Sequence, residues 1–120
     1  MPNVLIVDDS STMRKIVTRS LRQAGFVVDE IFEAADGVEG LNSLDANKVD
    51  LILSDINMPN MDGLEFVKSV RGKGNKVPIV MITTEGGEDV INEAIASGAS
   101  GSIRKPFTPE QLQEKLGGLL

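Results

Sequence analysis

The chain of 120 residues contains no cysteine, histidine, tryptophan or tyrosine. Without cysteine no disulfide can form, and without cysteine or histidine the side chains that zinc prefers are missing. Four phenylalanines offer little for base stacking or for binding a sugar ring. The apolar runs are about four residues long, far short of the roughly 20 needed to span a bilayer. We therefore expect a cytoplasmic protein without membrane insertion.

The charge balance is acidic, with 12 basic and 18 acidic residues and a net charge of −6. No basic stripe is available to displace counterions from a phosphate backbone, so nucleic acid is not an expected partner. The length supports one hydrophobic core but leaves no room for a second module. We expect a single domain over residues 1–120, whose output passes through partner proteins.

Short apolar runs alternate with segments of helical periodicity along the whole chain. The expected strands cover residues 4–7, 26–32, 49–53, 79–82 and 101–104. The expected helices lie between the first strand and residue 25, over 37–46, from 62 to about 72, after 86–87, and from 108 onwards. Five strands in strict alternation with five helices predict an α/β fold. Right-handed crossovers would place the helices on both faces of a parallel sheet.

Individual residues predict where the helices begin and end. Gly25 suits a left-handed cap after the first helix. The pair Asp62 and Glu65 has the spacing of a capping box, and so has the pair Thr108 and Gln111. In the fourth helix we expect one apolar face, made of Ile91, Ala94, Ile95 and Gly98.

Reactive side chains follow four of the expected strands, at the point where each strand ends. They are Asp8 and Asp9, Asp55, Thr83 and Thr84, and Lys105. The carboxyl ends of parallel strands lie on one edge of a sheet, which is where open α/β folds bind ligands. We therefore expect these distant segments to form one pocket. Its three carboxylates, hydroxyls and ammonium suit a divalent cation and a phosphoryl group.

Taken singly, these residues have ordinary explanations, since a carboxylate after a strand is more often a helix cap or a solvated turn residue. The adjacent pair Asp8 and Asp9 favours a functional role, because one carboxylate suffices to cap a helix and a second like charge beside it is repulsive. Mg²⁺ would relieve that repulsion and leave coordination positions for a phosphate. Asp55 is then a candidate nucleophile that forms an acyl phosphate, with Lys105 as a neutralising charge and Thr83 as a hydrogen-bond donor.

The chain resembles the receiver domains of two-component response regulators, most closely those of the single-domain chemotaxis type. The matching stretches are residues 5–10, 33–37, 55–59 with 61–63, and 98–101 with 105–107. The resemblance runs over the whole chain. It implies a flavodoxin-like five-stranded parallel sheet in the order 2-1-3-4-5, flanked by five helices.

The resemblance implies a metal site and a phosphoacceptor. Asp55 would accept the phosphoryl group from the phosphohistidine of a kinase. Asp9, Asp55 and the main-chain carbonyl of Asn57 would bind Mg²⁺ directly, and Asp8 would act mainly through a bound water. Asn57 and Glu85 would flank the path of the attacking water and tune the lifetime of the phosphoryl group.

The other implied roles concern the phosphoryl oxygens and the readout. Thr83 and Lys105 would contact those oxygens, and the peptide bond before Pro106 would be cis. The family usually carries tyrosine or phenylalanine three residues before the lysine, where this chain has Ser102. A serine cannot fill the space of a ring that turns inward. We expect the readout to depend mainly on movement of the loop 84–87, unless Ser102 is simply neutral.

The resemblance also implies partners. A histidine kinase would supply the phosphoryl group, and a downstream target such as a flagellar motor component or a phosphatase would read it, in chemotaxis or motility. We expect a monomer whose target-binding surface lies near Ile91, Arg104 and Lys115. The chain would not be an enzyme, although Mg²⁺-dependent autophosphorylation and autodephosphorylation would be intrinsic to it.

Three alternatives remain open at this point. A phosphorelay intermediate would use the same site to pass the phosphoryl group onward. A flavin-binding electron carrier could share the sheet topology, but residues 8–12 combine hydroxyls with two repelling carboxylates, and no tyrosine or tryptophan could stack on the flavin. A phosphatase with an aspartyl intermediate needs a second acid two residues beyond the nucleophile, where this chain has Asn57.

Overall fold

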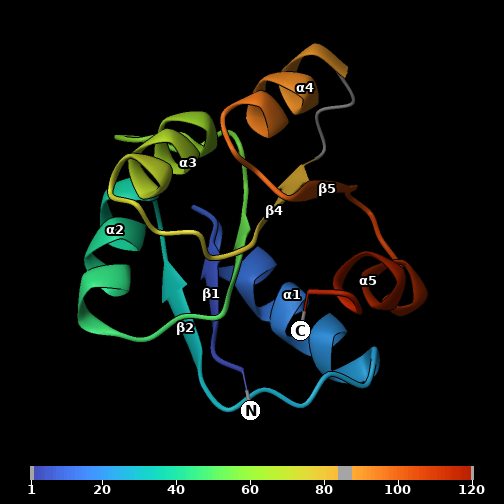
Figure 1. Ribbon diagram of the computed structural model, residues 1–120. Helices are drawn as coiled ribbons and strands as arrows, with labels where there is room; N and C mark the ends of the chain where they lie inside the picture. The colour runs from blue at the N-terminus through green and yellow to red at the C-terminus, as the bar shows by residue number, and fades with distance from the viewer. Residues whose placement is uncertain (1, 84–87, 120) are drawn as a thin grey trace.

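The computed structural model describes residues 2–83 and 88–119. Five strands and five helices alternate within these residues (Figure 1), as the sequence predicts. In chain order they are β1 (Val4–Val7), α1 (Ser11–Gln23), β2 (Ile31–Ala34), α2 (Gly37–Ala46), β3 (Leu51–Ser54), α3 (Gly63–Gly72), β4 (Ile79–Thr83), α4 (Glu88–Ala96), β5 (Gly101–Arg104) and α5 (Pro109–Leu116). No helix of the described residues is long and apolar enough to cross a membrane.

The strands form one parallel sheet in the order β2-β1-β3-β4-β5, which confirms the expected topology. Their register aligns the carboxyl ends. Val7, the last residue of β1, pairs with Ala34 at the end of β2 and with Ser54 at the end of β3. Thr83, at the end of β4, pairs with Arg104 at the end of β5. The residues that follow these strands therefore start from one edge of the sheet.

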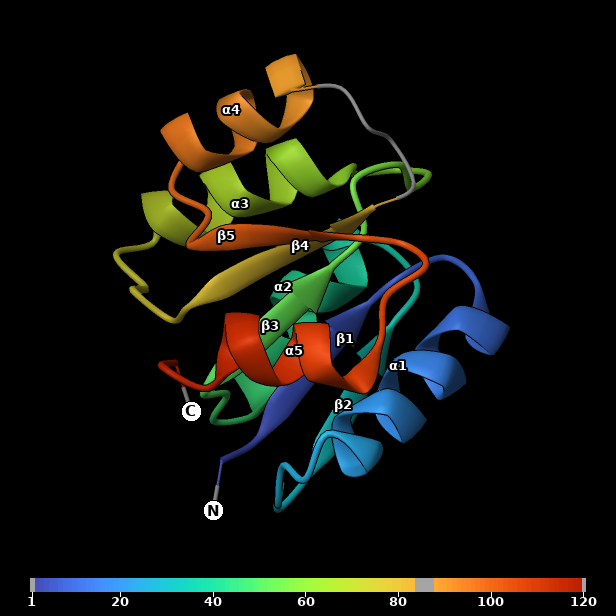
Figure 2. The same ribbon diagram turned by 90° about the vertical axis from the view of Figure 1, so that its right-hand side faces the viewer.

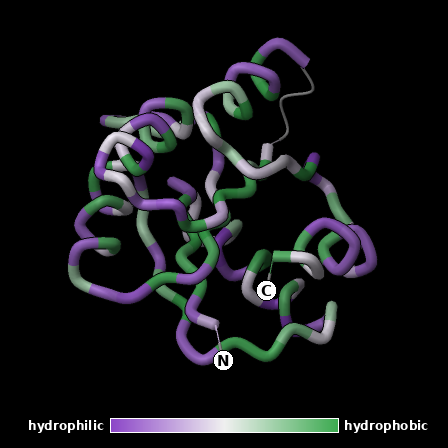
Figure 3. Tube along the Cα trace, in the orientation of Figure 1, coloured by the Kyte–Doolittle hydropathy of each residue, from purple (hydrophilic) through white to green (hydrophobic). Residues whose placement is uncertain are grey.

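Helices cover both faces of the sheet. α1 and α5 lie on one face, and α2, α3 and α4 lie on the other (Figures 1 and 2). Alternate residues of the central strands supply two cores: Leu5 and Val7 pack on the side of α2 to α4, while Val4 and Ile6 pack on the side of α1 and α5. Figure 3 shows that the helices alternate between hydrophobic and hydrophilic segments along the chain.

The predicted helix ends are largely confirmed. Gly25 follows α1 with a φ of +88°, a left-handed conformation that glycine adopts without steric cost. The Asp62 carboxylate accepts a hydrogen bond from the backbone N–H of Glu65 at the start of α3. Thr108 and Gln111 form both bonds of a capping box at α5. These local bonds fix where α3 and α5 leave the ligand-binding edge.

Two expected strands begin later than the sequence indicates. The second begins at Ile31 instead of Phe26, because Phe26 and Val28 pack against the core beneath α1 and α5 without pairing in the sheet. Val27, between them, is 63% exposed. The third covers Leu51–Ser54 and not 49–53, since Val49 packs beside the core ahead of the strand.

The expected apolar face of the fourth helix is wrong at two positions, because Gly98 lies beyond the end of α4 at Ala96 with a φ of +119° and Ile95 faces away from the core. Ile95 is 48% exposed, whereas Ala94 is fully buried and Val90 packs against the same core. The pair Val90 and Ala94 is spaced by one helical turn and sets the buried stripe. Ile95 lies about 100° further round the helix, where it faces away from the core.

Candidate functional site

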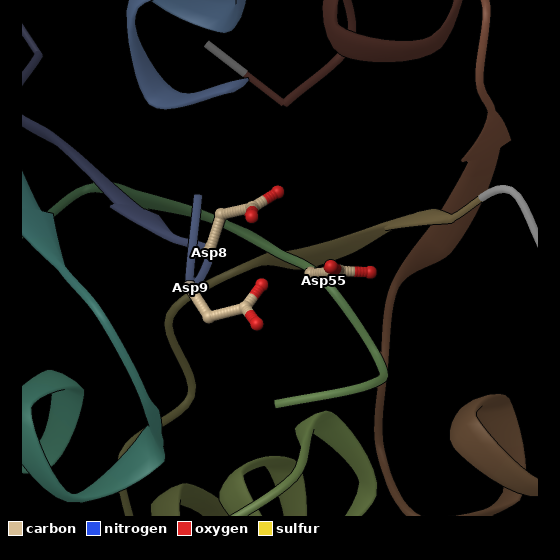
Figure 4. Close-up of side chains that lie close together, drawn as sticks. All are labelled: Asp8, Asp9 and Asp55. Atoms are coloured by element: carbon tan, nitrogen blue, oxygen red, sulfur yellow. The ribbon is translucent and has the colours of Figure 1, made fainter. Parts of the chain in front are cut away.

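Three carboxylates meet at the carboxyl edge of the sheet. Asp8 and Asp9 follow β1, Asp55 follows β3, and each offers an oxygen within 4.8 Å of those of the other two. Figure 4 shows the side chains of Asp8 and Asp9 reaching from the end of β1 toward the side where Asp55 lies. Asp8 is buried, the Asp55 side chain is 14% exposed, and Asp9 is exposed. The cluster is therefore open to solvent on one side.

Neither aspartate after β1 is needed as a helix cap. The Ser10 hydroxyl caps α1 by accepting a hydrogen bond of 3.2 Å from the N–H of Met13. Asp62 fills the same role for α3, seven residues after Asp55. The helix-cap explanation for carboxylates in these positions is thereby removed. Repulsion among three neighbouring carboxylates that cap no helix favours a cation-binding role.

Among the residues that the structure describes, Lys105 supplies the one ammonium that contacts the cluster. Its Nζ lies 3.1 Å from Oδ2 of Asp8 and 3.7 Å from Oδ2 of Asp55, and its side chain is only 10% exposed. One positive charge faces three negative ones, so two negative charges remain uncompensated. A divalent cation of the hard, oxygen-seeking kind would neutralise that excess.

Burial raises the pKa of the Asp55 carboxyl above its usual value. The Lys105 ammonium and a hydrogen bond of 2.8 Å from the N–H of Ile56 act against this increase, whereas the charges of Asp8 and Asp9 add to it. The ionised form of Asp55 is thus held in an environment that disfavours it. A bound cation would stabilise the ionised form of such a carboxylate. A carboxylate oxygen can also attack a phosphoryl group and form an acyl phosphate, a mixed anhydride.

The end of β1 is fixed by contacts that the sequence does not reveal. Oδ1 of Asp8 accepts a hydrogen bond of 2.9 Å from the N–H of Ser10. Arg14 on α1 donates to the Asp8 carbonyl at 2.5 Å and forms an ion pair of 2.8 Å with Glu33 on β2. Glu33 lies in one of the matching stretches, but nothing in the sequence pairs it with Arg14. The pairing becomes evident only once α1 is placed beside β2.

The other site residues predicted from the sequence also lie at the carboxyl edge of the sheet, as far as the structure describes them. Thr83 is 1% exposed at the end of β4, and its carbonyl accepts a hydrogen bond of 2.8 Å from the N–H of Lys105. Asn57 is exposed in the loop that follows Asp55. The Lys105–Pro106 peptide is cis, as the resemblance implies. Thr84 and Glu85 lie outside the described residues.

The expected readout residues surround one cavity. Ile91, Arg104 and Lys115 all line a cavity of about 420 Å³ between α4, β5 and α5. Ser102 lines it too, and lies opposite Met81 in the sheet register. The three residues named from expected position alone therefore belong to one surface.

Comparison with known proteins identifies the family. The family model described as the response regulator receiver domain matches residues 4–117. The chain belongs to the receiver-domain family, the phosphoacceptor class of two-component signalling. This membership confirms the resemblance and gives no support to the flavin-binding alternative.

Particular relatives are chemotaxis proteins. The chain is 46% identical over 116 residues to "Chemotaxis protein CheY1" of Helicobacter pylori strain 26695, covering 94% of this chain and 92% of that protein. It is 46% identical over 120 residues to "Chemotaxis protein CheY homolog" of Campylobacter jejuni, covering 98% and 91%. The solved structure of Vibrio cholerae chemotaxis protein CheY4 matches with a TM-score of 0.87 and 44% identity, covering 100% of this chain and 99% of that one.

Proposed function

We propose that the chain is a single-domain response regulator of the chemotaxis type, which accepts a phosphoryl group on Asp55 in a Mg²⁺-dependent reaction. One observation carries the proposal: Asp8, Asp9 and Asp55 converge at the sheet edge with Lys105 as their only described ammonium contact. Relatives named as chemotaxis proteins support the pathway. Residues 1–120 act in this proposal as one domain.

The side chains at the edge fit Mg²⁺. Asp9, Asp55 and the carbonyl of Asn57 would hold the ion, and Asp8 would act through a water. All of these donors are oxygens, the ligands that Mg²⁺ prefers, and receiver domains generally use this ion at an acidic pocket. When bound, the ion offsets negative charge on the phosphoryl oxygens.

Asp55 is the nucleophile in this proposal. One of its carboxylate oxygens forms a bond to phosphorus while the bond between phosphorus and the kinase histidine nitrogen breaks. The bonding electron pair leaves with the imidazole. Lys105 lies within 4 Å of both Asp8 and Asp55, so it can follow the new negative charge by a small movement of its flexible stem.

Two further groups act on the phosphoryl oxygens and their lifetime. Thr83 would donate a hydrogen bond from the end of β4. Asn57 and Glu85 would flank the attacking water and set how long the acyl phosphate lasts. With a small acyl-phosphate donor, the chain would phosphorylate itself and later dephosphorylate itself. It would not turn over phosphomonoesters, because Asn57 stands where aspartyl phosphatases need an acid.

The phosphoryl group would be read at the surface of α4, β5 and α5. The phosphoryl group carries about −1.5 to −2 charge next to β4 and β5, in place of the single negative charge of the Asp55 carboxylate. A surface that responds through those strands would bind a flagellar motor component or a phosphatase, with the cavity lined by Ile91, Arg104 and Lys115 at its centre. Thr83 and Ser102 would be the switch positions. The protein would act as a cytoplasmic monomer between a histidine kinase and this target.

Transfer of labelled phosphate from a phosphorylated chemotaxis histidine kinase tests the proposal. The expected result is rapid loss of label from the kinase and its appearance on the wild-type chain, but not on Asp55→Asn. If label stays on the kinase with every chemotaxis kinase tried, the proposal is wrong. Onward transfer from the chain to a second histidine protein would instead identify a phosphorelay intermediate.

A further inference from the structure

The loop over residues 56–62 links the acceptor to α3 and carries Asn57, whose carbonyl is one of the three groups proposed to hold Mg²⁺. The loop is connected to a second, distant segment, the N-terminus of α2. The Asn60 side-chain amide donates a hydrogen bond of 2.8 Å to Oδ2 of Asp36. The N–H of Gly37 donates one of 3.1 Å to the carbonyl of Met61.

Asp36 has two tasks at once. Its Oδ1 accepts a hydrogen bond of 2.9 Å from the N–H of Glu39 and so caps α2, while Oδ2 accepts from Asn60. Asp36 as a whole residue is only 6% exposed. Both bonds lower the pKa of Asp36, with that from Asn60 contributing most. A buried carboxylate that accepts two hydrogen bonds holds both donors, here Asn60 and the N–H of Glu39, in fixed positions.

The anchored end of the loop has an unusual conformation. Asn60 has a φ of +65°, which residues other than glycine adopt at a cost and which asparagine tolerates best. Beside it, the start of α2 fits closely against the loop, since a Cβ at Gly37 would lie 2.6 Å from Cγ of Met61. The side-chain bond from Asn60 to Asp36 therefore stabilises a conformation that the backbone alone disfavours.

We propose that Asp36 and Asn60 form a positioning pair for the metal site, holding the loop and its Asn57 carbonyl in one conformation before Mg²⁺ arrives. This inference rests on the proposed function. Without the bond, the loop must lose conformational freedom when the ion binds, and that loss weakens affinity. Partners that orient metal ligands typically change affinity by about 10 to 100-fold when they are replaced.

Two variants isolate the bond. Asn60→Gly keeps the positive φ accessible and removes the amide, and it leaves the core intact because Asn60 is exposed. Asp36→Ser keeps an oxygen that can cap α2 but is too short to reach Asn60. Asp62→Ser is the matched control: it also replaces one capping aspartate by serine, at α3, where the carboxylate accepts from the N–H of Glu65.

The test is a Mg²⁺ titration followed by amide shifts in NMR, with phosphorylation rates measured at limiting and at saturating Mg²⁺. We expect about 10-fold weaker Mg²⁺ binding in Asn60→Gly and in Asp36→Ser. The double variant should be no weaker than either single one, because both remove the same bond. Phosphorylation rates should return to within about twofold of wild type at saturating Mg²⁺, and Asp62→Ser should bind as wild type does.

Wild-type Mg²⁺ affinity in the two variants would overturn the inference, even if their unfolding midpoints fell, because the pair would then be purely structural. Fully additive losses in the double variant would also overturn it. If the wild-type chain itself bound no Mg²⁺, the proposed function would fail and this inference with it.

Discussion

The Nζ of Lys105 lies 3.1 Å from Oδ2 of Asp8, although 97 positions separate the two residues in the chain. The same atom is 3.7 Å from Oδ2 of Asp55. Both carboxylates are more than four-fifths buried, so this ammonium is screened far less than a surface charge. It occupies the position of a built-in counterion beside the proposed metal site.

Lys105→Ala should bind Mg²⁺ several-fold more tightly than wild type and fail to respond to phosphorylation. Without the Lys105 ammonium, the negative charge of the carboxylates is no longer partly neutralised, so their attraction for Mg²⁺ is stronger. It also removes the group expected to follow the phosphoryl charge. Amide shifts in NMR, recorded with Mg²⁺ and then with a phosphoryl mimic, measure both effects.

The matched control for that experiment is Lys73→Ala, which removes a surface ion pair of 3.5 Å with Asp45. It should behave as wild type in both titrations, since exposed pairs contribute little. If Lys105→Ala showed wild-type shift changes at α4, β5 and α5 with the mimic, the role assigned to the ammonium would be wrong.

At neutral pH, Asp55→Asn should unfold at a higher urea concentration than wild type. Its free energy of unfolding should be higher by about 1 kcal/mol. The folded pKa of Asp55 is raised, so its ionised form costs stability above that pKa. The advantage of the variant should shrink as the pH falls through the raised pKa and vanish below the ordinary one. An advantage that stayed constant across this range would contradict the assignment.

Mg²⁺ should make wild type more stable to unfolding than Asp55→Asn, which reverses the order expected without the ion. At about 100 times its dissociation constant, the ion should stabilise wild type by about 2.7 kcal/mol. Asp55→Asn lacks a ligand carboxylate and should gain much less. Equal stabilisation of both proteins in urea titrations would place the ion elsewhere.

Gly63→Ala and Gly72→Ala, at the two ends of α3, should have opposite effects. A Cβ at Gly63 would lie 2.3 Å from the carbonyl oxygen of Asp55 and 2.8 Å from Cα of Ile56, so backbone at the acceptor must move. We expect a loss of about 1 to 3 kcal/mol and slower phosphorylation. A Cβ at Gly72 meets nothing within 4 Å, so alanine should be neutral or slightly stabilising.

Arg71 should stabilise the loops that lead into β4 and β5, at the amino edge of the sheet opposite the site. Its guanidinium donates to the carbonyls of Gly98, Asn75 and Val77, at 3.0, 2.9 and 2.7 Å. Arg71→Ala should cost about 2 to 3 kcal/mol, because three carbonyls lose a charged donor. Phosphorylation of Asp55 should be unchanged.

Urea unfolding and hydrogen exchange at residues 97–99 measure the effect of Arg71. Arg71→Lys should recover only part of the loss, since an ammonium cannot match the planar fork. Lys76→Ala, at an exposed position in the neighbouring loop, is the control and should be neutral. Similar unfolding midpoints for Arg71→Ala and Lys76→Ala would contradict this account.

The sequence predicts the residues of the site better than it predicts where the strands begin and end. Asp8, Asp9, Asp55 and Lys105 could be placed together because strand ends in a parallel sheet share one edge. The start of β2 could not, since an apolar run at Phe26 signals burial without saying which element covers it. Phe26 is partly buried against the core on the side of α1 and α5, and it lies outside the sheet.

Contacts between side chains that are distant in the chain could not be predicted from the sequence, for a different reason. The bond from Asn60 to Asp36 and the ion pair of Arg14 with Glu33 depend on how loops and helices lie against one another. Neither pair has a characteristic spacing. Asp36 and Glu33 stand within a matching stretch of the family, but their partners follow only from the folded arrangement.

Phosphorylation of Asp55 is tested most directly by the intact mass of the chain after treatment with a small acyl-phosphate donor, with and without Mg²⁺. We expect a mass gain of one phosphoryl group on wild type in the presence of Mg²⁺. We expect no gain in excess chelator and none on Asp55→Asn. Full labelling of Asp55→Asn, or undiminished labelling of wild type in chelator, would contradict this assignment.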